Sequence, residues 1–156
     1  MARPQVGETA PSFVLPNQRG EPVSLEALRG RWVVLYFYPK AMTPGCTTQA
    51  CGIRDHRAEF DALGAVVLGV SPDPVARLAR FAERDRLDFD LLSDEDHAVA
   101  EAYGVWGPKK FMGREYEGIH RVTFIIDPEG RIAHLIPKVN TKTHAEEVLA
   151  WLREHR

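Results

Sequence analysis

The clearest pattern along the chain is a set of continuous apolar runs. Three of them, at residues 32–38, 65–70 and 122–126, do not alternate with polar residues, which is typical of strands buried on both faces of a sheet. A fourth run, at residues 132–136, follows the tetrapeptide Asp-Pro-Glu-Gly at residues 127–130. Because proline in second place and glycine in fourth suit a type I turn, we expect the last two runs to form a hairpin.

Helical patterns fall between and after these runs. Residues 47–63 have the composition of a helix, although a glycine weakens its middle. Asp73 followed by Pro74 predicts an N-cap and a first helical residue, and Asp94 is expected to cap a further helix. Thr143 stands three residues before a glutamate, which is the spacing of a capping box and predicts the start of a closing helix.

The order of these elements predicts the fold class. Residues 3–20 carry three prolines around a β-prone stretch at 13–15, which indicates an extended arm with an edge strand. Residues 104–118 are longer than most connections, so we expect this segment to be functional or mobile. Strands alternating with helices, then a hairpin and a last helix, predict an α/β fold with a mixed central sheet and helices on both faces. A chain of 156 residues is expected to form a single domain, residues 1–156.

Composition and charge exclude several classes of protein. With 44% hydrophobic and 27% charged residues, the chain is neither collagen-like, disordered nor a disulfide-dense miniprotein. A net charge of −2 gives no indication of a nucleic-acid partner or of an acidic membrane surface. The longest apolar run, residues 32–38, is far shorter than the ~20 residues that span a membrane. Since the first eight residues are polar and lack an apolar signal core, we expect a cytoplasmic protein.

The chemistry of the chain centres on its two cysteines, Cys46 and Cys51. In a cytoplasmic protein such a pair indicates redox or metal chemistry rather than a structural disulfide. Cys46 follows a buried strand, the strand-ending Pro39 and a turn from Thr43 to Gly45, and it opens a helical segment. Sites in open α/β sheets cluster beyond the carboxyl ends of strands, and a helix N-terminus favours the thiolate. Cys46 is therefore a candidate nucleophile, with the Thr43 hydroxyl placed either to donate to its sulfur or to accept from a hydroperoxide; the alternative is an inert buried thiol.

The spacing of the cysteines constrains their pairing. Five residues along a regular helix separate two Cα atoms by ~8.6 Å, whereas the Cα atoms of a disulfide are rarely more than ~6.8 Å apart. Oxidation of this pair would therefore require the helix to unwind, unless Cys51 is a core thiol without a redox role. A zinc site is not expected, because Cys46, Cys51 and His56 supply too few ligands and point in different directions. Four residues separate the cysteines, instead of the two typical of thioredoxin-type reductases.

In this segment the sequence resembles the peroxiredoxins, and within them the bacterioferritin comigratory protein (peroxiredoxin Q) branch. The signature Pro-x-x-x-Thr-x-x-Cys is met by Pro39, Thr43 and Cys46, and the second cysteine of the branch by Cys51. The likeness extends over nearly the whole chain. It continues through residues 103–107, 111–113 and 118–127.

The resemblance implies a thioredoxin-like fold and reduction of hydroperoxides without a metal or an organic cofactor. It implies that Cys46 is the peroxidatic cysteine and Cys51 the resolving cysteine, that thioredoxin or a similar dithiol is the electron donor, and that the protein is a monomer. Arg121 matches the active-site arginine of the family. Independently of the resemblance, a guanidinium at the head of a buried strand needs a partner, which is either a thiolate or an ordinary salt bridge. The residues expected to contact the hydroperoxide are Pro39, Thr43, Gly45 and Arg121.

Two departures and two rival functions accompany this resemblance. Many family members have Glu where this chain has Gln49, and Asp where it has Ala41, which puts in doubt how the helix is anchored. The six histidines are scattered along the chain, and we expect most of them to be solvated. The rival functions are a thiol-based redox switch without sustained turnover and a protein disulfide reductase, and the cysteine spacing argues against the second.

Overall fold

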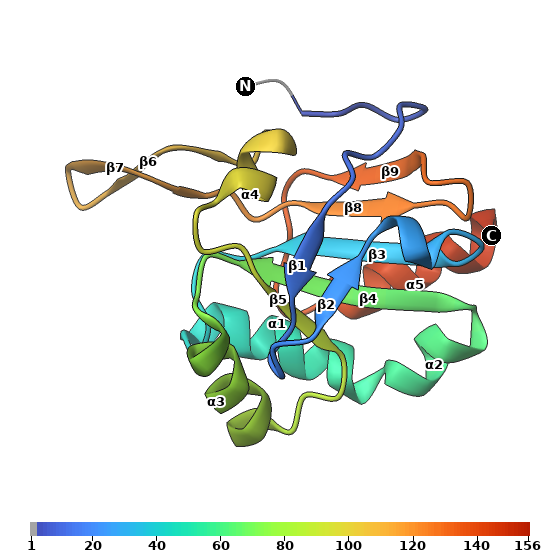
Figure 1. Cartoon of the computed structure of the whole chain (residues 1–156), viewed down its shortest axis with the longest axis horizontal. Helices are drawn as coiled ribbons and strands as arrows, with labels where there is room; N and C mark the ends of the chain where they lie inside the picture. The colour runs from blue at the N-terminus through green and yellow to red at the C-terminus, as the bar shows by residue number, and fades with distance from the viewer. Residues whose placement is uncertain (1–2) are drawn as a thin grey trace.

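The computed structural model describes residues 3–156, so Met1 and Ala2, the start of the polar N-terminal segment, lie outside the described residues. Its largest unit is a five-stranded sheet in the order β5-β4-β3-β8-β9 (Figure 1). The elements in chain order are β1 (Val14–Pro16), β2 (Pro22–Ser24), the 3-10 helix η1 (Glu26–Leu28), β3 (Trp32–Phe37), α1 (Pro44–Asp55), α2 (Arg57–Ala62), β4 (Ala65–Ser71), α3 (Val75–Asp85), β5 (Asp90–Ser93), α4 (Ala98–Ala102), β6 (Trp106–Phe111), β7 (Arg114–Ile119), β8 (Thr123–Ile126), β9 (Ile132–Ile136) and α5 (His144–His155).

The central strand β3 makes the sheet mixed. It pairs in parallel with β4, which pairs in parallel with β5, and it pairs antiparallel with β8 on its other side. The predicted hairpin between β8 and β9 is confirmed, because the two strands are antiparallel and the Gly130 N–H donates to the Asp127 carbonyl at 3.0 Å. The sequence pattern missed β5, since only two of its four residues are apolar and so short a run has no recognisable period.

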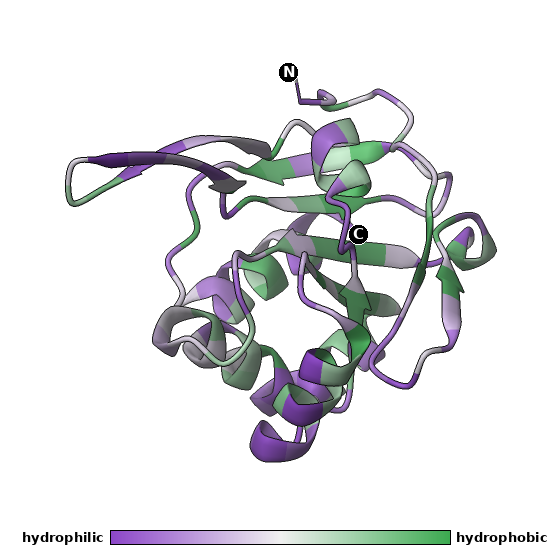
Figure 2. Cartoon of the chain, turned by 60° about the vertical axis from the view of Figure 1, so that its left-hand side comes forward, coloured by the Kyte–Doolittle hydropathy of each residue, from purple (hydrophilic) through white to green (hydrophobic). Residues whose placement is uncertain are grey.

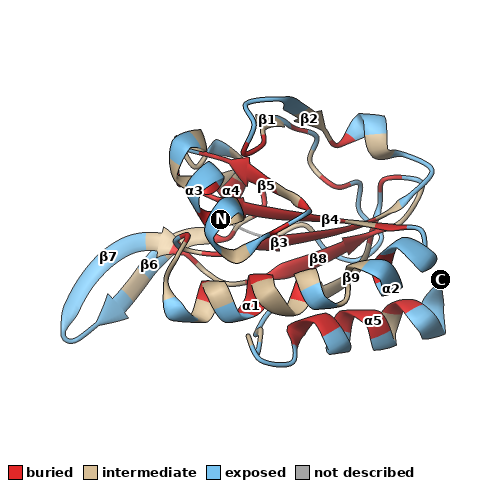
Figure 3. Ribbon diagram, turned by 90° about the horizontal axis from the view of Figure 1, so that it is seen from below, coloured by how far each residue is buried: buried red, intermediate tan, exposed pale blue. Residues whose placement is uncertain are grey.

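Helices cover both faces of this sheet, which confirms the predicted architecture. Side chains of α1, α2, α3 and α5 share one hydrophobic core with one face of β3 and β4. On the other face, α4 and the N-terminal arm pack against a second core, and Figure 3 shows the sheet as a buried layer between α1 and α5 on one side and β1, β2 and α4 on the other. None of the helices among residues 3–156 is long and apolar enough to cross a membrane.

The helix predicted for residues 47–63 is wrong in its bounds. It starts earlier, at Pro44, and it is divided into α1 and α2 at His56, which adopts φ −108° and ψ 13°. Proline at the first helical position accounts for the early start, because its fixed φ is already helical and its missing N–H would have no acceptor there. Cys46 therefore lies inside the first turn of α1 rather than before it.

The predicted caps are only partly correct. Asp94 is not the N-cap residue of α4, which is His97, but its carboxylate does accept from the backbone N–H groups of Val99 and Ala100 in the first turn of that helix. Asp73 is not the cap of α3; its carboxylate instead accepts from the Ala41 N–H and the Ser71 hydroxyl, both at 2.7 Å. The capping box at Thr143 is also wrong, because α5 begins there without any hydrogen bond from the Thr143 side chain.

The long segment at residues 104–118 is a hairpin of β6 and β7 that projects from the body of the protein (Figures 1 and 3). Its turn residues Met112 and Gly113 both have positive φ, 51° and 79°, as a type I′ turn requires. Figure 2 shows that the hairpin is mainly hydrophilic, in contrast to the hydrophobic strands of the central sheet. Phe111, Met112 and Tyr116 are nevertheless exposed.

Alanine substitutions at two glycines on the side of the sheet that carries α1 should have opposite effects on stability. Gly69 lies opposite Tyr36 in the sheet, and a Cβ added to it would come within 2.8 Å of the buried Tyr36 ring. Gly69→Ala should therefore lower the free energy of unfolding by about 1–3 kcal/mol, as overpacking of a core does. Urea denaturation followed by circular dichroism measures the effect.

Gly52→Ala is the matched control. Gly52 lies inside α1, and an added Cβ would meet only the Ala145 Cβ, at an ordinary 3.9 Å. Alanine should stabilise the protein by about 0.5–1 kcal/mol, because it restricts the unfolded chain more than glycine does. Equal effects of the two substitutions would contradict this account of the core.

Candidate active site

The candidate site forms where β3 ends and β8 begins. The two strands are antiparallel, with Tyr36 opposite Thr123 and with the Phe37 N–H donating to the Val122 carbonyl at 3.0 Å. Arg121 therefore arrives beside the segment that leaves β3 and turns into α1. The antiparallel pairing thus brings Arg121 next to the first turn of α1.

Cys46 is the third residue of α1 and is only 1% exposed. Arg121 Nη2 donates to its Sγ at 3.3 Å. The first backbone N–H bonded within the helix is that of Thr47, which donates to the Thr43 carbonyl, so the N–H groups of Gly45 and Cys46 have no intrahelical acceptor. A Cβ on Gly45 would lie 3.5 Å from Arg121 Nη2, so glycine leaves the guanidinium room at this turn.

The Thr43 hydroxyl is oriented by the loop and not by the sulfur. It donates to the Lys40 carbonyl at 2.7 Å, which commits its single proton. Of the two alternatives that the sequence left open, donation to the Cys46 sulfur is therefore not observed. Its lone pairs are directed away from its own proton and can accept a hydrogen bond from an incoming molecule.

A pocket of about 690 Å³ borders this loop. Pro39 and Thr43 line it, whereas Cys46 does not, so the pocket leads toward the loop rather than onto the sulfur itself. Trp106 and Phe111 both line it from the β6–β7 hairpin. Lys109 of the same hairpin also lines it, and partial burial together with the Arg121 cation lowers the pKa of this lysine.

Residues of α3 and of the segment after β4 hold the loop before α1 in place. The buried Asp73 accepts from the Ala41 N–H, and Arg77 donates to the Ala41 carbonyl at 2.7 Å while pairing with Asp73 at 3.1 Å. Both backbone polar groups of Ala41 are thus satisfied, although its own side chain carries no polar atom. No local pattern in the sequence points to this support, because 32 residues separate Asp73 from Ala41.

Three buried polar residues that sequence reasoning did not assign to the site stand behind Arg121. Arg121 Nη1 donates to Gln49 Oε1 at 2.5 Å, Gln49 Nε2 lies 3.2 Å from His144 Nδ1, and His144 Nε2 lies 2.7 Å from Thr123 Oγ1. His144 is 1% exposed, so it is an exception to the expectation that most of the histidines are solvated. Burial, with a smaller effect of the Arg121 cation, lowers the pKa of His144 to about 4.

Cys51 does not join this cluster. Both cysteines are free, and Cys51 is partly exposed on α1 five residues beyond Cys46. Partial burial raises the pKa of the Cys51 thiol. Since both residues lie in regular helix, the distance argument from the sequence applies, and a disulfide requires α1 to open.

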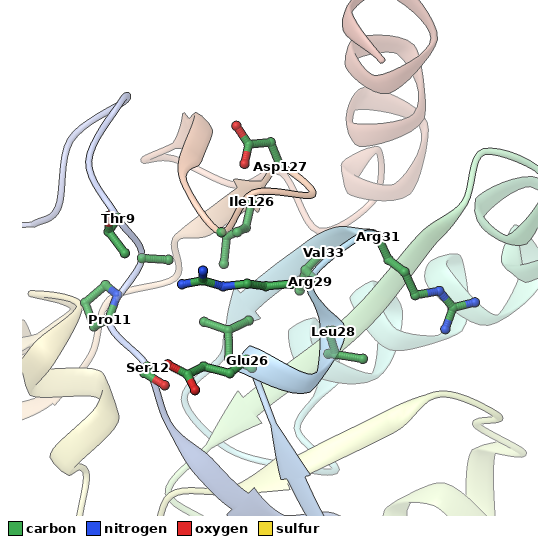
Figure 4. Close-up of a pocket in the computed structure, with 13 residues that line it drawn as sticks. Thr9, Pro11, Ser12, Glu26, Leu28, Arg29, Arg31, Val33, Ile126 and Asp127 are labelled. Carbon is green, nitrogen blue, oxygen red and sulfur yellow. The ribbon is translucent and has the colours of Figure 1, made fainter.

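Among residues 3–156, no group of three or more His, Cys, Asp or Glu side chains is placed to hold a metal ion. Another pocket, of about 240 Å³, lies at the opposite end of β3, where Val33 forms part of its lining and Arg29 extends between the N-terminal arm and Asp127 (Figure 4). Neither cysteine lines that pocket.

The buried His144 predicts a pH dependence of stability. Its folded-state pKa of about 4 lies below the unfolded value of ~6.5, so the unfolded chain binds the proton more tightly. Stability is therefore unaffected above about pH 6.5 and falls as the pH drops from there to about 4, by roughly 3 kcal/mol in total. Urea denaturation of the wild type and of His144→Gln at several pH values measures this loss. The variant should lack this part of the pH dependence, and parallel curves for the two proteins would contradict the assignment.

Comparison with known proteins agrees with this arrangement. The model of the AhpC/TSA family matches residues 6–135. The chain is 54% identical over 151 residues to Peroxiredoxin Bcp of Escherichia coli K12, covering 97% of both chains, and 47% identical over 150 residues to Peroxiredoxin Bcp of Bacillus subtilis, covering 96% of both.

Solved structures show the same likeness. A peroxiredoxin Q of Xylella fastidiosa superimposes with a TM-score of 0.93 at 33% identity, covering 99% of both chains. The bacterioferritin comigratory protein of Xanthomonas campestris, described for its alkyl peroxide reduction activity, superimposes with a TM-score of 0.90 at 37% identity, covering 97% of this chain and 99% of that one. These neighbours confirm the expected thioredoxin-like fold. The chain belongs to the AhpC/TSA family and is a thiol-dependent peroxidase of its peroxiredoxin Bcp, or peroxiredoxin Q, branch.

Proposed function

We propose that the chain reduces hydrogen peroxide and organic hydroperoxides through Cys46, with Cys51 as the resolving cysteine and thioredoxin or a similar dithiol as the reductant. The observation that carries the proposal is the 3.3 Å contact from Arg121 Nη2 to Cys46 Sγ. A guanidinium that donates to a sulfur stabilises a thiolate relative to a thiol, and the thiolate is the nucleophile. We propose further that the chain acts as a single domain, as a monomer and in the cytoplasm.

In the first step the Cys46 thiolate attacks the distal oxygen of the hydroperoxide. The S–O bond forms as the O–O bond breaks, so the sulfur is oxidised to a sulfenic acid and the leaving alkoxide takes a proton to become an alcohol, or water in the case of hydrogen peroxide. Thr43 Oγ1 accepts a hydrogen bond from the hydroperoxide. Arg121 and the unpaired N–H groups of Gly45 and Cys46 stabilise the charge that moves onto the leaving oxygen.

In the second step α1 opens and the Cys51 thiolate attacks the sulfenic sulfur. Hydroxide leaves as water, and an intramolecular disulfide forms. Gly52 and the β-branched Thr47 and Thr48 lower the cost of opening, because all three have weak helix propensity. The dithiol reductant then exchanges the disulfide and returns both thiols.

Cysteine variants separate these two steps. Cys46→Ser should abolish hydroperoxide consumption, because a serine hydroxyl cannot replace the thiolate. Cys51→Ser should consume one equivalent and leave a sulfenic acid on Cys46 that a dimedone probe traps for mass spectrometry. Full peroxidase activity in Cys46→Ser would contradict the assignment of Cys46 as the peroxidatic cysteine. Sustained turnover of the wild type with a thioredoxin system identifies an enzyme, whereas a single stoichiometric oxidation would identify a redox switch.

Arg121 variants test the electrostatic part of the mechanism. Arg121→Ala should lower the second-order rate constant of sulfenic acid formation by about 10²–10³, the usual cost of removing a donor to a developing negative charge. The rate constant of Arg121→Lys should lie between those of the wild type and of Arg121→Ala. The lysine ammonium lacks the planar fork with which the guanidinium donates to both Cys46 and Gln49. Stopped-flow kinetics with hydrogen peroxide measures the rates.

The matched control is Arg131→Ala. Arg131 is an exposed residue after the β8–β9 turn, far from the first turn of α1 in the fold. The rate constant of Arg131→Ala should equal that of the wild type. An unchanged rate constant in Arg121→Ala would show that Arg121 has only a structural role.

A further inference from the structure

A continuous chain of polar groups, buried beyond the partly exposed Arg121, runs from the Cys46 sulfur to Thr123. Its members are Arg121, Gln49 and His144, and the successive donor–acceptor distances are 3.3, 2.5, 3.2 and 2.7 Å. Gln49 and Thr123 are 0% exposed and His144 is 1% exposed. In so dry a place each polar atom needs a partner of the opposite polarity, because an unsatisfied one costs about 1–3 kcal/mol.

The direction of every hydrogen bond in this chain follows from its first member. A guanidinium only donates, so the Gln49 atom that faces Arg121 must be the amide oxygen. The amide nitrogen, which only donates, then faces His144 Nδ1, and that ring nitrogen must accept. The imidazole proton must therefore be on Nε2, where it donates to Thr123 Oγ1.

We propose that His144, as the neutral Nε2–H tautomer, is a positioning residue for the peroxidatic site, because it fixes the Gln49 amide so that its oxygen holds Arg121 against Cys46. This inference rests on the role proposed for Arg121. An amide can rotate by 180° and exchange its oxygen and nitrogen. Turned that way, Gln49 would direct its NH₂ at the guanidinium and displace it, and the acceptor at His144 Nδ1 prevents that rotation.

The surroundings of His144 support a neutral ring at neutral pH. It forms an edge-type ring contact with the buried Tyr36, with centroids 5.6 Å apart, and the charged group facing it is Arg121. Burial and that cation both oppose protonation and lower the pKa of His144. A protonated ring would carry a donor on Nδ1, which the Gln49 NH₂ could not meet.

The same logic explains why glutamine in particular needs an orienting partner. A carboxylate has two equivalent acceptor oxygens, so a glutamate at position 49 would accept from Arg121 in either orientation. Its second oxygen would then require a donor from His144, and the imidazole proton would move to Nδ1. The tautomer of His144 and the identity of residue 49 are therefore linked.

Nuclear magnetic resonance of the imidazole nitrogens tests this linkage directly. In the reduced wild-type protein the proton of His144 should be on Nε2, and in Gln49→Glu it should be on Nδ1. A proton on Nδ1 in the wild type, or the same tautomer in both proteins, would overturn the inference. This measurement does not depend on peroxidase activity, so its outcome is distinct from that of the cysteine variants.

A double-mutant cycle tests the positioning role. His144→Phe keeps a planar ring but removes the acceptor, and it should slow sulfenic acid formation by about 10- to 100-fold, as a displaced catalytic group does. In the Gln49→Glu background the same substitution should change the rate by less than about threefold, because a carboxylate does not need orienting. An equal loss in both backgrounds would show a merely structural role and reject the proposal.

His155→Phe is the control. It changes a histidine on the same helix at its exposed C-terminal end, outside the polar chain described above. Its rate constant should match that of the wild type. If His144→Phe does not fold, the tautomer measurement in the wild type and in Gln49→Glu still decides the question.

Discussion

The contact between the Arg121 guanidinium and the Cys46 sulfur joins residues 75 positions apart, and it exists only because β8 runs antiparallel to β3. Pairing of Tyr36 with Thr123 places the residues before β8 beside the segment that follows β3. A shift of this register by one residue would turn the neighbouring side chains to the opposite face of the sheet. A largely buried sheet therefore sets the geometry of the sulfur and its cation, while the groups proposed to react lie on a loop and a helix end.

The proposed mechanism places two opposing requirements on helix α1. In the reduced protein it has to hold Cys46 in its first turn, and the contacts of the preceding loop with Asp73 and Arg77 serve that state. For Cys51 to reach the sulfur, the same helix has to open, and Gly52 in its middle makes that less costly. The contacts of the loop thus lie before the first turn and Gly52 lies after it, so the two requirements act on different parts of one segment.

Burial of polar groups gives the site its precision. Gln49, His144 and Thr123 are almost fully covered, so each atom has one acceptable partner and the orientation of one group dictates that of the next. The exposed side of the site is different, since the pocket beside Pro39 and Thr43 is walled by a projecting hairpin whose tip is exposed. The protein therefore combines a rigid polar support behind the sulfur with an open approach in front of the loop.

The sequence alone determined the elements whose cause is local. Continuous apolar runs predicted β3, β4, β8 and β9, the Asp-Pro-Glu-Gly turn predicted the hairpin, and the segment from Pro39 to Cys51 pointed to thiol chemistry at a helix start. Two local signals were misleading. Asp73 has the form of an N-cap, but its carboxylate accepts from the distant Ala41 N–H, and the capping box predicted at Thr143 does not form.

Only the tertiary structure decided what surrounds Cys46. His144 carries no sequence mark that distinguishes it from five other histidines, and its place beside Gln49 depends on how α5 packs on α1. The orientation of the Thr43 hydroxyl and the position of the β6–β7 hairpin beside the loop were likewise open. The physical reason is that a side chain's partners are set by packing between elements far apart in the chain, whereas periodicity and turn chemistry report only on near neighbours.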